Sequence, residues 1–376
     1  MLCLGIATVA TAQPAAVKKA ANTTFTLTTF DAKGSILSTS NGVFVSNNGI
    51  CVSTWKPFVG AMKAEVTDNN GQKYSVETIL GANELYDVAK FKITAKTNAA
   101  LFAPSVVANS AAWIVMPSQA GAPIKANIDK VEKFMTKYNY CVLSTTASEK
   151  YNGAPVLNDK GQIVGIYNSN GTLQSATAAK YANYFLLSGL SQNDPTLLQS
   201  GIRIALPQQP DEAIIALMLS ATKIESLRMA TINDFLQKFP TLNNGYVTLA
   251  TKLLANGEVA EADKTLQQAI AKTTAKDEAH YNYGRLIFQG VTTAAIADKA
   301  KAQGWTLDKA MNEANEAYKL NPAPVYKHLQ AQIVYTKGNY QQAYHDFEAL
   351  TNTPIKNPEL YLEMAQCQEK LNASNE

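Results

Sequence analysis

The hydrophobic pattern of this 376-residue chain changes its period near residue 200, and that change constrains the fold more than any other feature. Up to about Leu190, apolar and polar residues alternate in short runs such as "FTLTTF" and "GVFVSNNGICVST". Such alternation predicts half-buried β-strands. From about Asp211 onward, apolar residues recur at helical spacing instead. We therefore expect a β domain followed by an all-α domain.

The β half spans residues 22–190. "AEVTDNNGQKYSVETILGA" predicts a hairpin that turns at Asn69-Asn70-Gly71. "VAKFKI", "AAWIVMPS", "YCVLSTTA" and "QIVGIYN" continue the series of strands. Many short strands without intervening helices indicate an all-β barrel or sandwich.

The helical half spans residues 211–376, after a junction at 191–210 that is rich in Gln, Pro, Asp and Ser. Helix pairs are predicted around turns at Asn256-Gly257 and Lys337-Gly338. These two glycines lie 81 residues apart, which fits two repeats of about 34 residues plus an insertion. The extra residues correspond to "GVTTAAIADKAKAQGWT".

Small residues at fixed spacing make this half similar to tetratricopeptide repeats (TPR). Ala331, Gly338 and Ala343 have that family's spacing, and "AYKLNPAPVY", with Pro322, resembles its junction between repeats. The resemblance implies a stacked array whose concave face binds a protein or peptide. An unrelated helical bundle is the alternative.

Charge and motif content name no other ligand class. The formal net charge is +3 and no basic run exceeds two residues, which gives no indication of nucleic-acid binding. We find no phosphate-binding glycine loop and no zinc-ligand spacing, so we expect neither a cofactor nor a metal. Cys51, Cys141 and Cys367 lie in apolar stretches and are expected to be buried free thiols, although a Cys51–Cys141 disulfide remains an alternative.

The N-terminal run "MLCLGIATVATAQ" resembles a secretory signal whose cleavage would follow Ala10-Thr11-Ala12. It lacks a basic first region, and a buried first strand is the alternative reading. No other apolar stretch approaches the ~20 residues that a membrane helix needs. We therefore expect residues 1–12 to be a signal peptide and the mature protein to be exported, to the periplasm, surface or medium of a Gram-negative-type bacterium, without an integral membrane segment.

Three stretches of the β half, in order, resemble motifs of trypsin-like serine peptidases, especially the bacterial periplasmic stress-peptidase branch. They are "SNGVFVSNNGICVSTWKPFVGA", "GANELYDVAKFKI" and "YNGAPVLNDKGQIVGI". The similarity covers roughly residues 35–185 and implies a double β-barrel. It places Lys56 at the histidine position, Asp87 at the aspartate position and Asn152 at the serine position. Only the acid of the catalytic triad is therefore retained.

Proton chemistry argues against catalysis at these positions. A serine nucleophile needs a neighbouring base of near-neutral pKa, and an asparagine amide has no ionisable proton of useful pKa. The only histidines, His280, His328 and His345, all lie in the helical half. A Lys56 base acting on Ser144 or Ser148 remains the catalytic alternative, that of an atypical serine peptidase.

The altered site suggests several non-catalytic roles. Lys56 and Asp87 are expected to form a partly buried ion pair, or alternatively to bind an anionic group in the former substrate cleft. Gly153 is expected to keep a backbone N–H at the oxyanion position. Trp55, Lys56 and Ala154 are candidate cleft residues, with core packing the alternative for Trp55.

The sequence thus predicts an exported pseudo-peptidase that binds a protein or peptide partner. The concave face of the helical array is the first candidate surface, and the former cleft is a second. A purely structural component of the cell envelope is a further alternative.

Overall fold

The computed structural model describes residues 13–373, so the predicted signal peptide lies outside the described residues. The chain divides into two compact units, Met1–Ser220 and Ala221–Glu376. No helix within residues 13–373 is both long and apolar enough to cross a membrane.

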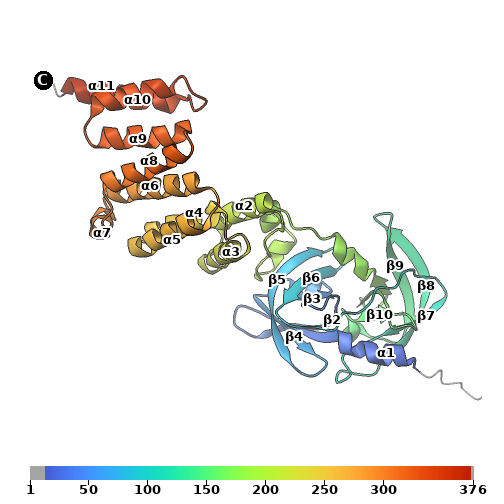
Figure 1. The fold of residues 1–376 in the computed structure, drawn as a ribbon. Helices are drawn as coiled ribbons and strands as arrows, with labels where there is room; N and C mark the ends of the chain where they lie inside the picture. Colours follow the sequence, from blue (N-terminus) through green and yellow to red (C-terminus); the bar gives the residue numbers. More distant parts are fainter. Residues whose placement is uncertain (1–12, 374–376) are drawn as a thin grey trace, which may run out of the picture. The chain divides into compact units, whose positions relative to one another are not determined.

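The N-terminal unit begins with a closed six-stranded antiparallel barrel in the order β1-β2-β3-β6-β5-β4 (Figure 1). Pairing of β1 with β4 closes it. The predicted hairpin turn at Asn69-Asn70-Gly71 joins β4 to β5, where Asp68 accepts the N–H groups of Asn70 and Gln72 and Gly71 has φ +80°. The strands are β1 (Thr24–Phe30), β2 (Ile36–Phe44), β3 (Ile50–Ser53), β4 (Lys63–Asp68), β5 (Lys73–Asn83) and β6 (Val88–Ile93).

A second closed six-stranded barrel follows, in the order β10-β11-β12-β9-β8-β7. Its closing pair is β10 with β7, in which Val156 lies opposite Ile114. The predicted double β-barrel is thus confirmed. The strands are β7 (Ser110–Ile114), β8 (Ile124–Phe134), β9 (Tyr138–Thr145), β10 (Pro155–Leu157), β11 (Ile163–Ser169) and β12 (Gln174–Thr177).

Each barrel has its own apolar core, and a third cluster joins the two. Phe25, Phe44 and Phe91 pack ring against ring inside the first barrel. The joining cluster combines residues of the first barrel, such as Val52, with residues of the second, such as Ile166. Side chains along each strand point alternately into and out of the barrel. The apolar residues of the alternating sequence pattern therefore fill these cores.

The segment predicted as a junction is part of the N-terminal unit. Ile204 forms a parallel bridge with Ile79, and Ile202 and Leu197 lie in the core of the first barrel. The boundary between the compact units therefore falls after Ser220 rather than at 191–210. The helical segments of this unit are α1 (Ala15–Ala20), η1 (Ala21–Thr23), η2 (Lys56–Phe58), η3 (Glu149–Tyr151), η4 (Ala179–Tyr184), η5 (Gly189–Asn193), η6 (Leu197–Gln199), α2 (Pro210–Leu219) and, across the boundary, η7 (Ser220–Thr222).

The C-terminal unit consists of helical hairpins stacked in sequence order (Figure 1). The hairpin α4–α5 turns at Gly257 and α9–α10 at Gly338, the two predicted positions. Helices α6 and α8 also pack as a pair. The segment that connects them contains α7, which lies in the predicted insertion. The helices are α3 (Glu225–Lys238), α4 (Asn243–Ala255), α5 (Val259–Lys272), α6 (Lys276–Thr292), α7 (Ala297–Ala302), α8 (Leu307–Leu320), α9 (Pro324–Thr336), α10 (Tyr340–Leu350) and α11 (Pro358–Ala373).

Small residues let these helices approach closely, as the sequence pattern predicts. A Cβ added to Gly284 of α6 would lie 2.9 Å from the carbonyl oxygen of Ala310 on α8. Ala314, Ala331 and Ala343 are fully buried between helices. The fold of this unit is therefore that of a helical repeat.

Candidate functional site

Asp87 lies at the entrance to β6, in the left-handed backbone region with φ +47°. One of its carboxylate oxygens, Oδ1, accepts the main-chain N–H groups of Trp55 (2.7 Å) and Lys56 (2.8 Å). These two residues precede and begin η2, so the carboxylate fixes the chain as it leaves β3. Asp87 thus binds the backbone at the predicted base position.

The other oxygen of Asp87 connects the two barrels. Oδ2 accepts a hydrogen bond from Nδ2 of Asn168 on β11, at 2.5 Å. Asn168, at the end of "QIVGIYN", was not predicted as a site residue; a polar residue inside a buried strand was the available signal. Asp87 therefore acts as a polar bridge between the two barrels.

The predicted ion pair between Lys56 and Asp87 is wrong. Lys56 is exposed, and the described residues show no ion pair between its ammonium and the Asp87 carboxylate. The physical reason is that two peptide N–H groups and one amide already occupy that carboxylate. Lys56 meets Asp87 only through its backbone.

The predicted cleft residues are mostly buried. Trp55 is 1% exposed, stacks on Phe58 with ring centroids 5.6 Å apart, and belongs to the core of the first barrel. Ala154 is fully buried. Of the three candidate cleft residues only Lys56 is accessible, so core packing is the role of Trp55.

Asn152, at the position of the nucleophile, is held on both sides of its amide group. Its Oδ1 accepts the N–H of Ser169 at 2.7 Å, and its Nδ2 donates to the carbonyl oxygen of Ser169 at 3.0 Å. Its own carbonyl oxygen accepts from Asn41 N–H (3.0 Å) and Ser40 Oγ (2.8 Å). The side chain thus pairs with the backbone of β11, and the main-chain carbonyl of Asn152 joins this turn to β2 of the first barrel.

Three consecutive N–H groups around Asn152 donate to acceptors within the protein. The N–H groups of Tyr151 and Asn152 donate to Ser148 and Glu149 within η3, at 3.1 and 2.9 Å. The N–H of Gly153 donates to the carbonyl oxygen of Tyr167 at 2.9 Å. An oxyanion hole needs free donors aimed at the developing charge. The expectation that Gly153 presents such a donor is therefore wrong.

Ser144 and Ser148, the candidate nucleophiles for a Lys56 base, are not hydrogen-bonded to Lys56 in the described part of the chain. Ser144 on β9 donates its hydroxyl to the Asp129 carboxylate of β8, and the hydrogen bonds from Ser144 and Asn127 lower the pKa of Asp129. A carboxylate of lowered pKa is a weak base. Ser148 precedes η3, and within residues 13–373 no hydrogen bond joins Lys56 to either serine.

The three histidines have partners inside the helical unit. His280 of α6 contacts Glu313 of α8 at 2.7 Å, and His328 of α9 contacts Glu363 of α11 at 2.6 Å. His345 contacts Gln341 at 2.9 Å on an exposed helix face. The first two contacts link neighbouring helices of the repeat, and the third lies within α10.

Cys51, Cys141 and Cys367 are buried free thiols, as predicted, and Cys51 and Cys141 are not joined. Burial raises the pKa of Cys141 to about 11 and that of Cys51 well above its usual value. A thiol of raised pKa is a poor nucleophile. Among residues 13–373 no cluster of three or more His, Cys, Asp or Glu could hold a metal ion.

The hydrogen bonds that Asp87 accepts give a first prediction. Asp87→Ala should destabilise the N-terminal unit by about 2–3 kcal/mol, because two N–H groups and an amide lose a charged acceptor. Lys56→Ala should change stability by less than about 0.5 kcal/mol, because that side chain is exposed. Hydrogen exchange of the β3 and β6 amides measures both; equal losses would restore the ion-pair interpretation.

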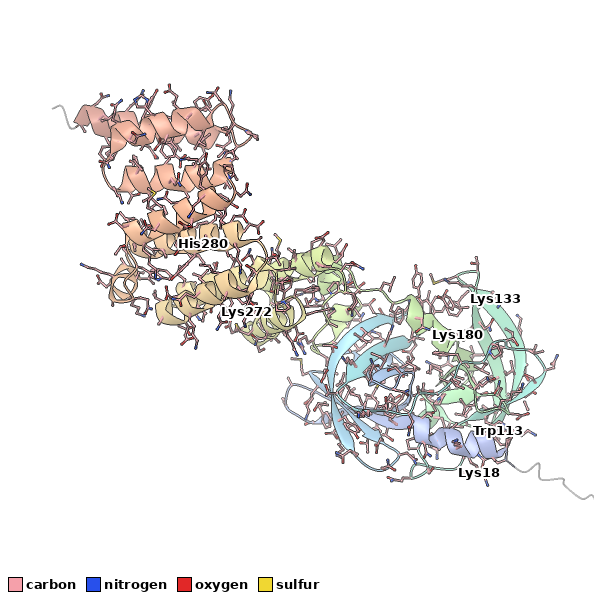
Figure 2. All side chains as sticks on the ribbon, in the orientation of Figure 1. Lys18, Trp113, Lys133, Lys180, Lys272 and His280 are labelled. Atoms are coloured by element: carbon pink, nitrogen blue, oxygen red, sulfur yellow. The ribbon has the colours of Figure 1, made fainter. Side chains whose placement is uncertain are left out.

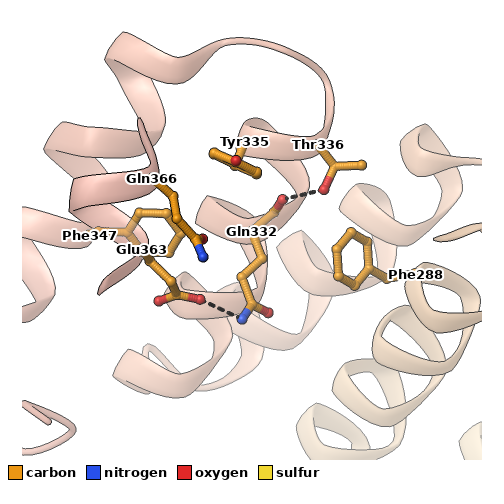
Figure 3. Close-up of a pocket in the computed structure, with 7 residues that line it drawn as sticks. All are labelled: Phe288, Gln332, Tyr335, Thr336, Phe347, Glu363 and Gln366. Carbon is orange, nitrogen blue, oxygen red and sulfur yellow. Dashed lines mark hydrogen bonds between the residues drawn. The ribbon is translucent and has the colours of Figure 1, made fainter. Parts of the chain in front are cut away.

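A groove in the helical unit offers a second candidate site (Figure 3). Its volume is about 140 Å³, and side chains from α6, α9, α10 and α11 line it. Phe288 and Tyr335 supply apolar walls, while Gln332 Nε2 donates to Glu363 Oε1 at 2.8 Å. The lining residues are Phe288, Gln332, Tyr335, Thr336, Phe347, Glu363 and Gln366.

Comparison with known proteins shows a distant structural similarity. No protein-family profile matches the sequence, and no curated protein matches it. A solved structure that resembles it is a serine endoprotease from Yersinia pestis, with 19% identity and a TM-score of 0.40. The match covers 45% of this chain and 63% of the endoprotease, so this chain spans less than two thirds of it. The double barrel described here rests on its own strand order.

Proposed function

We propose that this chain is a non-catalytic protein of the trypsin-like peptidase fold, whose TPR-type helical array binds a protein or peptide partner. The observation that carries the non-catalytic part is the turn at residues 148–153. The N–H groups of Tyr151, Asn152 and Gly153 and the side-chain amide of Asn152 are hydrogen-bonded within the protein. A substrate carbonyl would meet no hydroxyl or thiol at position 152, and the N–H groups of residues 151–153 already have acceptors.

The N-terminal sequence supports export as part of the same proposal. If residues 1–12 are removed by a signal peptidase, the mature chain begins at Gln13. Mass spectrometry of the protein recovered from its native compartment checks this start.

The groove of Figure 3 is the surface that best fits a peptide. Residues of α6 and α9, each the first helix of its hairpin, line it together with residues of α11. An extended peptide needs apolar contacts for its side chains and polar partners for its backbone. Phe288 and Tyr335 provide the first, and the amide groups of Gln332 and Gln366 provide the second.

A paired substitution on α11 tests this surface. Gln366 and Gln368 are both exposed, but only Gln366 lines the groove. Peptides selected from a displayed random library on the full chain should bind Gln366→Arg at least about tenfold more weakly, because the longer side chain fills the groove. Gln368→Arg adds the same charge outside the groove and should bind as the wild type does.

Fluorescence polarisation of the selected peptides gives both affinities. Failure to select any peptide, or equal weakening in the two variants, would contradict the proposed binding surface.

A further inference from the structure

A pocket of about 240 Å³ in the N-terminal unit is lined by three lysines from separate segments. Lys133 lies on β8, Lys137 is the last residue of the β8–β9 turn, and Lys180 lies on η4 (Figure 2 labels Lys133 and Lys180). Ser105, Tyr138 and Asn139 contribute polar groups and an aromatic ring to the same wall. No aspartate or glutamate is among the lining residues.

The three ammonium groups have no acidic partner. Within residues 13–373 none of them forms an ion pair. Lys133 Nζ donates to Asn139 Oδ1 at 2.6 Å, and Lys137 Nζ lies over the rings of Tyr138 (5.1 Å) and Tyr184 (5.8 Å). Two of the cations are therefore held at the pocket by neutral groups, which leave their charge uncompensated.

Two acids near these segments, Glu132 and Asp159, are directed elsewhere. Glu132 is the neighbour of Lys133 on β8, so its side chain points to the opposite face, where it pairs with Lys130 at 2.5 Å. Asp159 lines an adjacent pocket and accepts a hydrogen bond from Trp113 Nε1 at 2.7 Å. The positive charge of the pocket is thus not neutralised by either.

The turn between Lys133 and Lys137 is strained. Met135 and Thr136 have φ values of +46° and +62°, a region that costs roughly 1–3 kcal/mol for a non-glycine residue and is least tolerated by a β-branched one. Loops with such strain are concentrated at functional sites. Here the strained turn connects Lys133 to Lys137, and both of these lysines line the pocket.

We propose that this pocket binds a phosphate or sulfate monoester of a small molecule. A monocarboxylate would balance only one of the three charges, whereas a phosphate monoester carries close to two and a sulfate ester presents several acceptor oxygens. Lysine binds such groups as a point charge. The volume, somewhat below the ~300–1,000 Å³ typical of ligand pockets, leaves space for a small organic group against the Tyr138 ring. This site lies in the barrel unit and is independent of the proposed peptide groove.

Calorimetry on the full chain at low ionic strength tests the proposal, with glucose 6-phosphate and glucose 6-sulfate as probes and glucose as the uncharged control. Wild type should bind at least one ester and not glucose. Lys133→Gln/Lys180→Gln should weaken binding at least about tenfold through the loss of charge-assisted hydrogen bonds.

The matched control is Lys19→Gln/Lys33→Gln, which removes the same charge from exposed positions of the same unit. It should bind within about twofold of wild type, since exposed charges outside the pocket interact only weakly with the ligand through water. Equal weakening in the two double variants, binding of glucose as tight as that of the esters, or no binding of either ester by wild type would each overturn the proposal.

Discussion

Gly153→Ala is expected to destabilise the N-terminal unit by about 2–5 kcal/mol. Gly153 has φ +84°, where a Cβ costs about 1–2 kcal/mol. That Cβ would also overlap the carbonyl oxygen of Asn41 and approach the hydroxyls of Ser40 and Ser53 at 2.8 Å. A backbone atom cannot rotate away as a side chain can, so overpacking adds about 1–3 kcal/mol.

Gly34→Ala separates the two effects. Gly34 has a similar φ of +79°, but nothing lies within 4 Å of an added Cβ. Its substitution should therefore cost only the backbone term of about 1–2 kcal/mol. Urea unfolding monitored by hydrogen exchange of the barrel strands compares the two variants. Equal losses would show that the turn at Asn152 does not pack against the first barrel as described.

Asp263→Ala is expected to destabilise the helical unit by about 3–5 kcal/mol. Asp263 is 5% exposed on α5, and its Oδ1 accepts from Tyr283 (2.5 Å), Trp305 Nε1 (2.6 Å) and Lys309 (3.1 Å). Its Oδ2 accepts from Gln267 at 2.7 Å. Removing the carboxylate leaves these donors without their acceptor. Because Trp305 follows α7, the insertion also loses its attachment to α5.

The pH dependence of this effect has a defined sign. Burial by itself raises the pKa of Asp263, but the hydrogen bonds from Tyr283, Trp305 and Lys309 outweigh it and lower the pKa below its usual value. The stabilisation is therefore complete above the unfolded pKa of about 4 and is lost as pH falls through the lower folded pKa. The difference between wild type and Asp263→Ala should shrink below about pH 4.

Asp308→Ala is the control for this experiment. Asp308 pairs with Lys337 at 2.5 Å, but its side chain is 83% exposed, so its loss should cost less than about 1 kcal/mol. Hydrogen exchange of α5 and α6 amides at pH 7 measures both variants. A loss for Asp263→Ala no greater than that for Asp308→Ala would contradict the structural role of Asp263.

Local features were the predictable part of the fold. Hairpin and helix turns at Gly71, Gly257 and Gly338 follow from short sequence signals, and all three glycines adopt positive φ. The insertion was predictable because it interrupts a regular spacing. The segment 191–210 was misjudged as a junction because its polar composition hides the alternation of "GIRIAL", which places Ile202 and Ile204 in the first barrel.

The partners of the site residues could not be predicted in the same way. Asn168 reaches Asp87 across 81 residues of sequence, and only barrel packing brings the two together. The charge of Lys56 suggested an ion pair, whereas its peptide N–H made the contact. Asp263 gave no signal, since a single acid on an amphipathic helix looks like a surface residue. Sequence patterns report which face is buried, but not which donor meets which acceptor.

The most direct test of the non-catalytic proposal is labelling of the intact protein with a fluorophosphonate probe, followed by mass spectrometry, beside a fluorogenic peptide library. We expect no labelled residue and no cleavage, because position 152 holds an amide instead of a nucleophile and the N–H groups of residues 151–153 already have acceptors. A labelled serine whose signal disappears in Lys56→Ala would contradict it.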